Sequence, residues 1–291
     1  PDILFLPGNS YFGLPLLLSA IPATRRPVIV NKLSNVLART SRGWVKQVIF
    51  DRLLAFRMRF VDHFVFMSES LRDADVARIP NASGRCHVVN QPVIETKAVV
   101  PSSLAVPSPL EDAGQRPVIL AAGRLVPQKN YGVLLRAMAL LPSDLEAELH
   151  ILGDGPLRSA LEADTERLGI AHRVWFHGFV DAISPFLAHS KLFALSSDFE
   201  GFPSVLVEAL AAGVPVVTTE STPAVRDIID DSTGRIVPLR DAEKMADAMS
   251  DVLRNDEVFR KAIKNRPLKY DLVSSAENYL LLFEKLLADA K

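Results

Sequence analysis

The residues most able to do chemistry lie between Ser197 and Gly213, in the run SDFEGFPSVLVEALAAG. Glu200 stands directly before Gly201, Phe202 and Pro203, and Glu208 follows five residues after that proline. Glycine permits a tight turn or a close approach of a ligand, and proline is favoured at the start of a helix. The pattern therefore predicts Glu200 in a loop that follows a strand and Glu208 in the second turn of a helix.

The backbone between the two glutamates predicts an anion site. The first N–H groups of a helix have no partner within the helix, so those of Ser204 and Val205 are free to bind a phosphate. Each carboxylate accepts hydrogen bonds from hydroxyls, so the order is hydroxyl acceptor, phosphate cradle, hydroxyl acceptor. A nucleotide sugar has this layout. The alternative is structural, because glutamates near a helix N-terminus also stabilise the helix dipole.

Two further loops have residues suited to phosphate. Gly123-Arg124-Leu125-Val126-Pro127-Gln128-Lys129-Asn130 combines the planar fork of Arg124 with the mobile charge of Lys129, and both can offset charge on a departing diphosphate. Leu152-Gly153-Asp154-Gly155-Pro156 offers Gly153 for close backbone approach, although this run is also ordinary turn chemistry.

The elements that position these loops are strands and helices in strict alternation, which is typical of an α/β protein with parallel sheets. We expect strands at 3–6, 28–31, 63–67, 86–89, 117–122, 147–152, 174–176, 192–196, 214–218 and 234–237, with helices between them. All three loops then follow strands, and the carboxyl ends of parallel strands form the ligand-binding edge of such a sheet.

The chain is predicted to hold two domains. Residues 1–95 form a partial first domain, 96–116 a linker, 117–255 a complete second domain, and 256–291 closing helices. The last helix is expected to run from Ser274 to Ala290, with Ser274 and Glu277 as a capping box.

The three loops together resemble the carboxyl-terminal domain of family 4 retaining glycosyltransferases, over residues 117–255. The resemblance implies the GT-B fold, with two Rossmann-like domains, and a donor domain that binds a UDP or GDP sugar. It implies that Arg124 and Lys129 hold the diphosphate and that Glu208 holds the ribose hydroxyls. Glu200, with the backbone of Gly201, Phe202, Pro203 and Ser204, would hold the donor sugar, and the final helix would cross back to the first domain.

The first third fits that family less well. Residues 61–71 and 86–93 resemble the last two βα units of an acceptor domain, but only four strands are predicted where a full domain needs six or more. Asn31 to Asn35 occupy the place where the family often has a histidine. The first domain is therefore expected to be truncated, and its catalytic contacts stay unassigned.

The predicted function is transfer of a hexose from a nucleotide diphosphate sugar to an acceptor hydroxyl with retention of configuration, with a glycan or a lipid-linked glycan as acceptor. Glu200, Arg124 and Lys129 are the predicted catalytic residues, with no metal or other cofactor. Two alternatives remain: a GT-B nucleotide-sugar epimerase, and a non-catalytic remnant that binds the donor. The pair Asp73 and Asp75 is interpreted as solvated charge on a surface helix, and His177 as a packed or surface histidine rather than a pocket residue.

Composition limits the partners. The 33 basic and 34 acidic residues give a net charge of -1, which argues against nucleic acid as a partner. The charge is uneven, because residues 1–100 hold 13 basic and 7 acidic residues. No membrane-spanning segment or signal peptide is predicted. The single Cys86 excludes a disulfide framework and fits a reducing compartment, so we expect a cytoplasmic protein.

Residues 42–60 predict a helix with a basic rim. The default interpretation packs its apolar side into the core, and the alternative is peripheral contact with anionic lipid on the inner face of the membrane. The apolar side comprises Trp44, Val48, Ile49, Leu53, Phe56 and Phe60, and the rim comprises Arg42, Lys46, Arg52, Arg57 and Arg59.

Overall fold

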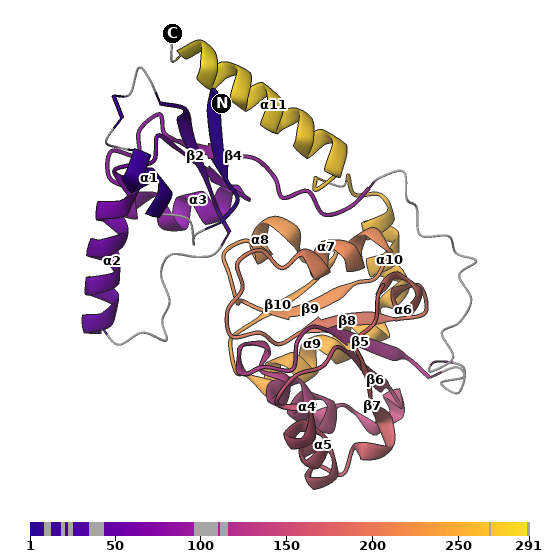
Figure 1. The fold of residues 1–291 in the computed structure, drawn as a ribbon. Helices are drawn as coiled ribbons and strands as arrows, with labels where there is room; N and C mark the ends of the chain where they lie inside the picture. The colour runs from indigo at the N-terminus through magenta and orange to yellow at the C-terminus, as the bar shows by residue number, and fades with distance from the viewer. Residues whose placement is uncertain are drawn as a thin grey trace. The chain divides into compact units, whose positions relative to one another are not determined.

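The computed structural model describes residues 1–8, 13–18, 21–22, 26–34, 44–95, 110, 116–267 and 269–289. Its strands form two parallel sheets, which confirms the predicted α/β class (Figure 1). The chain divides into two compact units. The first comprises Pro1–Val93, Thr222–Asp227 and Lys269–Lys291, and the second comprises Ile94–Ser221 and Ile228–Leu268.

The first unit contains a four-stranded sheet in the order β1-β2-β3-β4, with every neighbouring pair parallel. The strands are β1 (Ile3–Leu6), β2 (Val28–Leu33), β3 (His63–Phe66) and β4 (Cys86–Val88). The helices of this part are α1 (Gly13–Leu18), α2 (Trp44–Met58) and α3 (Glu69–Asp75), with a 3-10 turn at Val76–Arg78. Val30 and Val65 lie on one face of the sheet, and neighbouring residues Ile29 and Phe64 are equally buried on the other.

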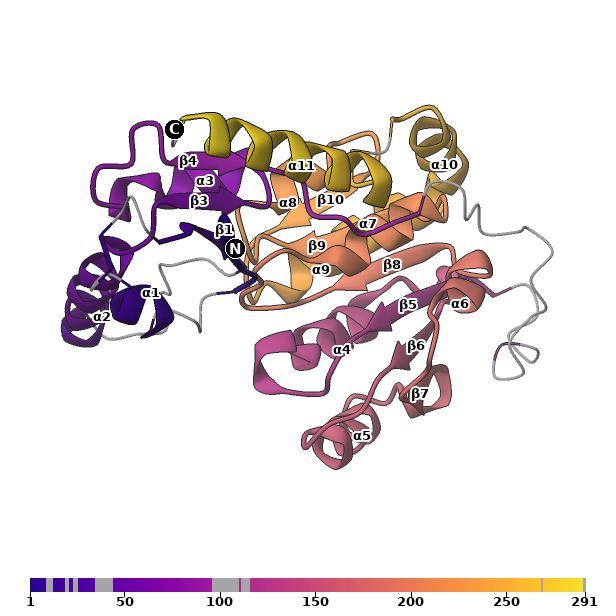
Figure 2. The same ribbon diagram turned by 45° about the horizontal axis from the view of Figure 1, so that its top comes forward.

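Helix α11 (Leu272–Asp289) covers the face that carries Val30 and Val65 (Figure 2). Leu286 is buried in that cluster, and Phe5 packs edge-on against Tyr279 and Phe283 with ring centroids 5.5 and 5.7 Å away. Helix α11 thus completes the core that the first strands of the chain begin.

The start of α11 differs from the predicted capping box. The helix begins two residues before Ser274, and the carboxylate of Asp271 accepts the Ser274 backbone N–H at 2.9 Å. Ser274 is therefore inside the first turn, where its hydroxyl also donates to Asp271. Aspartate is as good a cap as serine, so the sequence allowed both starting points.

Helix α2 is oriented against the default interpretation. Leu54 and Met58 are buried, whereas Ile49, Leu53 and Phe56 of the predicted core side are exposed. The helix has apolar residues on two sides, and the buried side, with Leu54 and Met58, is the one that the pattern did not select. Arg42 and the side chains of Trp44 and Lys46 lie outside the described residues.

In helix α3, the interpretation of Asp73 and Asp75 as solvated charge is wrong for Asp75. Asp75 is buried, 2% exposed, and lies 3.3 Å from the guanidinium of Arg78, so it is not solvated charge. Asp73 at the same helix is paired with Arg72 at 2.8 Å and is exposed as expected.

The second unit contains a six-stranded parallel sheet in the order β10-β9-β8-β5-β6-β7. The strands are β5 (Val118–Ala122), β6 (Glu148–Leu152), β7 (Val174–Gly178), β8 (Leu192–Leu195), β9 (Val216–Thr219) and β10 (Gly234–Val237). All six were predicted, with shifts of one or two residues at their ends. Because β5 pairs with both β6 and β8, the loops that follow these three strands are neighbours.

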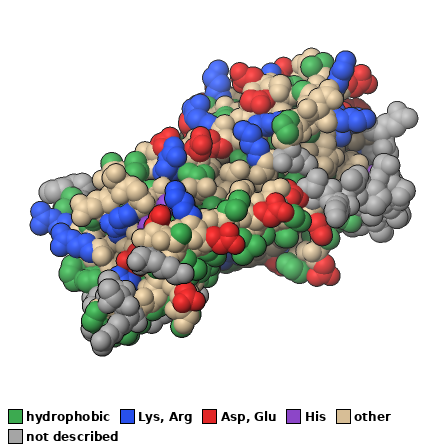
Figure 3. Space-filling view, turned by 90° about the horizontal axis from the view of Figure 1, so that it is seen from above, with side chains coloured by type: hydrophobic (Ala, Val, Ile, Leu, Met, Phe, Trp, Pro, Cys, Tyr) green, Lys and Arg blue, Asp and Glu red, His purple; other side chains and the backbone are tan. Residues whose placement is uncertain are grey.

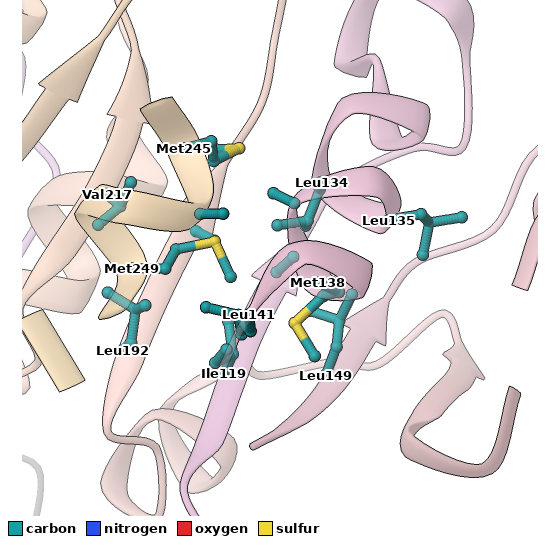
Figure 4. Packing of buried hydrophobic residues seen from close by; sticks show 14 of the residues in the cluster. Ile119, Leu134, Leu135, Met138, Leu141, Leu149, Leu192, Val217, Met245 and Met249 are labelled. Atoms are coloured by element: carbon teal, nitrogen blue, oxygen red, sulfur yellow. The ribbon is translucent and has the colours of Figure 1, made fainter. Parts of the chain in front are cut away.

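The helices of the second unit are α4 (Tyr131–Leu140), α5 (Arg158–Arg167), α6 (Ser184–Ala188), α7 (Ser204–Ala211), α9 (Ala242–Arg254) and α10 (Asp256–Lys264), and the short α8 (Val225–Ile228) spans the division between the units. Short 3-10 turns lie at Pro127–Lys129, Ser143–Leu145 and Ala171–Arg173. Leu134 and Met138 of α4 pack with Met249 of α9 over Ile119 and Leu149 (Figure 4). This core fixes the sheet that carries the loops.

The predicted linker lies outside the described residues, apart from Leu110 and Arg116. Among the described helices, none is both long enough and apolar enough to cross a membrane.

Candidate functional site

The three predicted loops gather at one edge of the second sheet. They follow β6, β5 and β8, which are adjacent and parallel, so their carboxyl ends meet. Each leads into a helix: α5 after the Gly153 loop, α4 after the Gly123 loop and α7 after the Glu200 loop. The sheet thus positions the loops at the edge where ligands bind in open α/β folds.

The loops after β5 and β6 touch through their backbones. A Cβ on Gly153 would lie 2.2 Å from the carbonyl oxygen of Gly123, and a Cβ on Gly155 would lie 2.6 Å from that of Leu125. Leu125 N–H also donates to the Asp154 carbonyl at 2.9 Å. Only glycine fits at these contacts, so the glycines are needed for loop-to-loop packing as well as for any ligand approach.

The loops after β5 and β8 are joined by side chains. The Lys129 ammonium donates to Glu200 Oε1 at 2.7 Å, and the Ser197 hydroxyl donates to the same oxygen at 2.7 Å. The side chains of Lys129 and Glu200 are 18% and 11% exposed. Two predicted catalytic residues from segments 71 positions apart therefore meet in a partly buried, hydrogen-bonded pair.

Four residues without an assigned role strengthen this junction. Gln128 donates to the Phe199 carbonyl at 2.8 Å, and Asn130, at a left-handed φ of 44°, donates to Asp198 at 2.8 Å. Arg240, in the loop after β10, pairs with the other side of Asp198 at 2.7 Å and lowers the pKa of that carboxyl by its hydrogen bond. The sequence signal was present for three of them, because Gln128, Asn130 and Asp198 lie inside the motif runs.

Ser221 supplies an unpartnered hydroxyl beside the same loop. Its carbonyl accepts the Glu200 N–H at 3.0 Å, and its buried Oγ has no hydrogen-bond partner among the described residues. Nothing in its sequence context marked this serine.

Helix α7 places Glu208 and the predicted anion cradle. The Val205 N–H has no acceptor among the described residues, whereas the Ser204 N–H donates to the Phe202 carbonyl at 2.9 Å. Of the two donors predicted here, only Val205 is open. Gly201 and Pro203 are buried, and Phe202 is half-buried. Glu208 is half-buried and forms no ion pair with any described residue, and burial raises the pKa of its carboxyl.

Arg124 and His177 are placed differently from the Lys129 and Glu200 pair. Arg124 is exposed and forms no ion pair with a described residue, although it shares the loop of Lys129. His177 is packed, as interpreted from the sequence, with its Nε2 2.9 Å from Nδ1 of His150 and its ring 5.7 Å from that of Phe186.

A cavity of 670 Å³ lies away from this edge. It is lined by Arg116, which precedes β5, by Leu141 and Glu146, which precede β6, and by Arg173, which precedes β7. These residues stand at the amino ends of the strands, so the cavity is separate from the loops described above. Within the described ranges, no group of three His, Cys, Asp or Glu side chains is arranged to hold a metal ion.

A family profile described as "Glycosyl transferases group 1" matches residues 107–268. This chain belongs to that glycosyltransferase family. The matched range begins before β5 and ends after α10, and so contains all three loops.

Among curated relatives, this glycosyltransferase is similar to a Campylobacter jejuni N-acetylgalactosamine-N,N'-diacetylbacillosaminyl-diphospho-undecaprenol 4-alpha-N-acetylgalactosaminyltransferase. The identity is 35% over 54% of this chain and 45% of that protein. It is also 34% identical to the lipopolysaccharide core biosynthesis glycosyltransferase LpsE of Rhizobium meliloti, over 51% of this chain and 43% of LpsE. The chain matches about half the length of these relatives.

The fold resembles a solved structure, Anabaena Alr3699/HepE in complex with UDP. The TM-score is 0.82 over 98% of this chain and 79% of that one, at 18% identity. The chain therefore has the GT-B fold.

Proposed function

We propose that this glycosyltransferase moves a hexose from a nucleotide diphosphate sugar, with UDP or GDP as the nucleotide, to an acceptor hydroxyl with retention of anomeric configuration. The observation that carries the proposal is the Lys129–Glu200 pair, which joins the loops after β5 and β8 at the carboxyl edge of the sheet. A cation and a carboxylate side by side suit the two halves of such a donor, the diphosphate and the sugar hydroxyls.

The reaction breaks the bond between the anomeric carbon and the diphosphate, and forms a bond from that carbon to the acceptor oxygen. The acceptor proton leaves with the nucleoside diphosphate. Negative charge grows on the diphosphate as its bond breaks, and Lys129, Arg124 and the Val205 N–H are the groups that would offset it. Glu200 would orient the sugar, and Glu208 would accept hydrogen bonds from the ribose hydroxyls. The positive charge comes from side chains, so the proposal includes no metal.

The contacts of Lys129 support a preorganised role. Its ammonium is held in place by Glu200, so it need not be ordered when the diphosphate arrives. Arg124, exposed and without an ion pair to a described residue, is free to fold onto the ligand.

The acceptor proposed is a glycan or a lipid-linked glycan. Support comes from the relatives' names: one acts on a diphospho-undecaprenol glycan, and another is assigned to lipopolysaccharide core synthesis. A protein that works on such acceptors is expected in the cytoplasm, with peripheral contact to the membrane.

Lys129→Ala tests the proposal. Each of UDP-glucose, UDP-N-acetylhexosamine and GDP-mannose is offered with a panel of glycan and lipid-linked acceptors. We expect turnover at saturating donor to fall 100-fold or more, on the order of the loss when one charge-stabilising group is removed. Lys191→Ala is the matched control, because this lysine also forms an ion pair, with Asp256 at 2.8 Å, away from the loops.

Several outcomes would contradict the proposal. Unchanged turnover in Lys129→Ala would contradict the catalytic role of Lys129. Loss of activity in the presence of a chelator would contradict a mechanism without metal. Conversion of the donor alone indicates an epimerase, and nucleoside diphosphate binding without transfer to any acceptor indicates a donor-binding remnant. An anomeric proton signal in the product's NMR spectrum that indicates inverted configuration would contradict retention.

A further inference from the structure

Helix α2 has apolar side chains on two opposite sides. Leu54 and Met58 are buried within the first unit. Ile49, Leu53 and Phe56 are 63%, 47% and 47% exposed. At about 100° per residue, these three fall within a sector of roughly 60° that points away from Leu54 and Met58. The exposed side is therefore a continuous apolar strip over two helical turns.

Arginines border the strip on both sides. On the same helical projection Arg52 lies about 60° to one side of Ile49, and Arg57 lies about 80° to the other. Arg59 follows directly after the helix on the Arg52 side, and all three arginines are exposed. The acid of the helix, Asp51, projects toward the packed side and accepts a hydrogen bond from Gln47 at 2.7 Å.

The space-filling view shows the same association of side chains. At the left of the view, Lys and Arg side chains lie beside hydrophobic ones (Figure 3). The charge balance of residues 1–100, 13 basic against 7 acidic, agrees with this local excess.

We propose that this face of α2, defined by Ile49, Leu53, Phe56 and the arginines 52, 57 and 59, docks on a membrane surface that contains anionic lipid. An interfacial helix lies in the plane of the membrane, with its apolar strip at the boundary between headgroups and acyl chains. Arginines beside the strip can keep their guanidinium groups among the lipid phosphates while their stems cover apolar surface. The strip, with Arg52 and Arg59 on one side and Arg57 on the other, has this composition.

A second copy of the chain fits the face less well. A stable interface buries on the order of 800 Å² on each partner, and the strip has three large side chains. Two-fold pairing through it would also bring arginine rows from both copies together, with no acid on the strip to offset them. The lipid surface supplies the opposite charge.

The inference deepens the proposed function, since a lipid-linked acceptor lies in such a surface. It does not depend on the donor site for its test. Vesicle binding is measured by flotation with phosphatidylcholine vesicles and with vesicles that also contain phosphatidylglycerol. We expect binding to the anionic vesicles, weaker binding as salt rises, and little binding to phosphatidylcholine alone.

Two double variants test the two components of the face. Arg52→Gln with Arg57→Gln is expected to weaken binding roughly 25-fold, at about fivefold for each basic residue near an anionic surface. Ile49→Ser with Leu53→Ser is expected to weaken it at least as much. Leu280→Ser with Leu281→Ser on α11 is the matched control, because these leucines are 62% and 63% exposed and lie outside the face.

The proposal fails if the wild-type protein ignores anionic vesicles, or if the two α2 variants bind as well as the α11 control. It also fails if Ile49→Ser with Leu53→Ser converts a dimer to a monomer in light scattering without a change in vesicle binding. Titration with UDP and GDP, done on the same variants, separates the two ideas. Variants of the α2 face that keep nucleotide binding but lose vesicle binding support the docking face. Variants that lose nucleotide binding but keep vesicle binding contradict the docking face without contradicting the donor site.

Discussion

Glu200 and Glu208 are the same residue type at the two ends of one motif, yet their environments differ. Glu200 receives hydrogen bonds from Lys129 and Ser197, so its charge is compensated. Glu208 is half-buried without an ion pair to a described residue, and burial raises the pKa of its carboxyl. A buried, uncompensated charge costs stability and is retained where a ligand uses it.

Glu208→Gln is therefore expected to stabilise the second unit and weaken donor binding. A raised pKa in the folded state means that the charged form is penalised as pH rises through that pKa, so the gain appears near neutral pH and vanishes at low pH. We expect a Tm increase of about 2 °C at pH 7, by calorimetry. Nucleotide affinity should fall roughly tenfold or more, from loss of hydrogen bonds to a charged group. A lower Tm together with unchanged affinity would show that Glu208 has only a structural role.

His150 is a second buried titratable residue, on β6 beside His177 of β7. Its ring stacks on those of Trp175 and His177, with centroids 4.9 and 5.1 Å away. Its Nε2 is 3.5 Å from Glu148. Burial, with a smaller contribution from His177, lowers the pKa of His150 to about 4, and burial together with Arg158 lowers the pKa of His177.

The free energy of unfolding of the second unit should depend on the titration of His150 between neutral and acidic pH. The unfolded chain binds a proton at His150 near pH 6.5, whereas the folded protein does so only near pH 4, so the free energy of unfolding falls as pH drops between those values. The free energy of unfolding is measured by urea titration at several pH values in that window. His150→Gln should reduce the slope of this free energy against pH by the equivalent of up to one proton. The slope is compared because the substitution also removes stacking at every pH. Equal slopes in both proteins would contradict the assignment.

At the scale of elements, the site is a junction of three strand-to-helix connections. The loops after β5 and β6 meet at backbone distance, and the loops after β5 and β8 meet through Gln128, Asn130 and Lys129. Each connection is short, with a strand at one end and a helix at the other. Because the three loops contact one another, displacement of one loop moves the groups on its neighbours.

Gly153→Ala tests this coupling. The added methyl would lie 2.2 Å from the Gly123 oxygen, so the loops must separate. We expect a loss of about 2 kcal/mol or more in stability and impaired nucleotide binding. Gly213→Ala is the control, because Gly213 has a left-handed φ of 77° with nothing within 4 Å of the added Cβ. It should cost only ~1 kcal/mol and leave nucleotide binding intact. Equal effects on binding would mean that the loop contact is unimportant.

At the scale of the whole molecule, the first unit is assembled from distant parts of the chain. The core of its sheet combines Val30 and Val65 with Leu286 of α11. Although α11 follows the second unit in sequence, it groups with residues 1–93. The first unit is therefore incomplete until the last helix has been made.

Leu286→Ala is expected to destabilise the first unit selectively. Leu286 is 2% exposed, and truncation of such a buried leucine costs about 2–5 kcal/mol. Hydrogen exchange should show faster exchange in β1 to β3 while β5, β6 and β8 keep their protection. Leu281→Ala on the same helix, 63% exposed, should change stability by no more than about 0.5 kcal/mol. Loss of protection in β5 would instead place Leu286 in a core shared with the second sheet.

Residue patterns along the chain are enough to predict the ten strands of the described residues, the order of the elements and the three ligand-type loops at strand ends. These follow from local rules: the hydrophobic period along the chain, glycine and proline at turns, and the parallel arrangement that strict alternation imposes. The family resemblance depended on the same loops, because they are continuous in sequence.

The tertiary structure alone decided which residues meet. Lys129 reaches Glu200 because β8 lies beside β5, and Arg240 reaches Asp198 because only β9 separates β10 from β8. This strand order cannot be read from any single segment of the sequence. It also decided which apolar side of α2 packs and whether Asp271 or Ser274 caps α11. In both cases the local pattern fits two alternatives, and packing against the rest of the unit selects one.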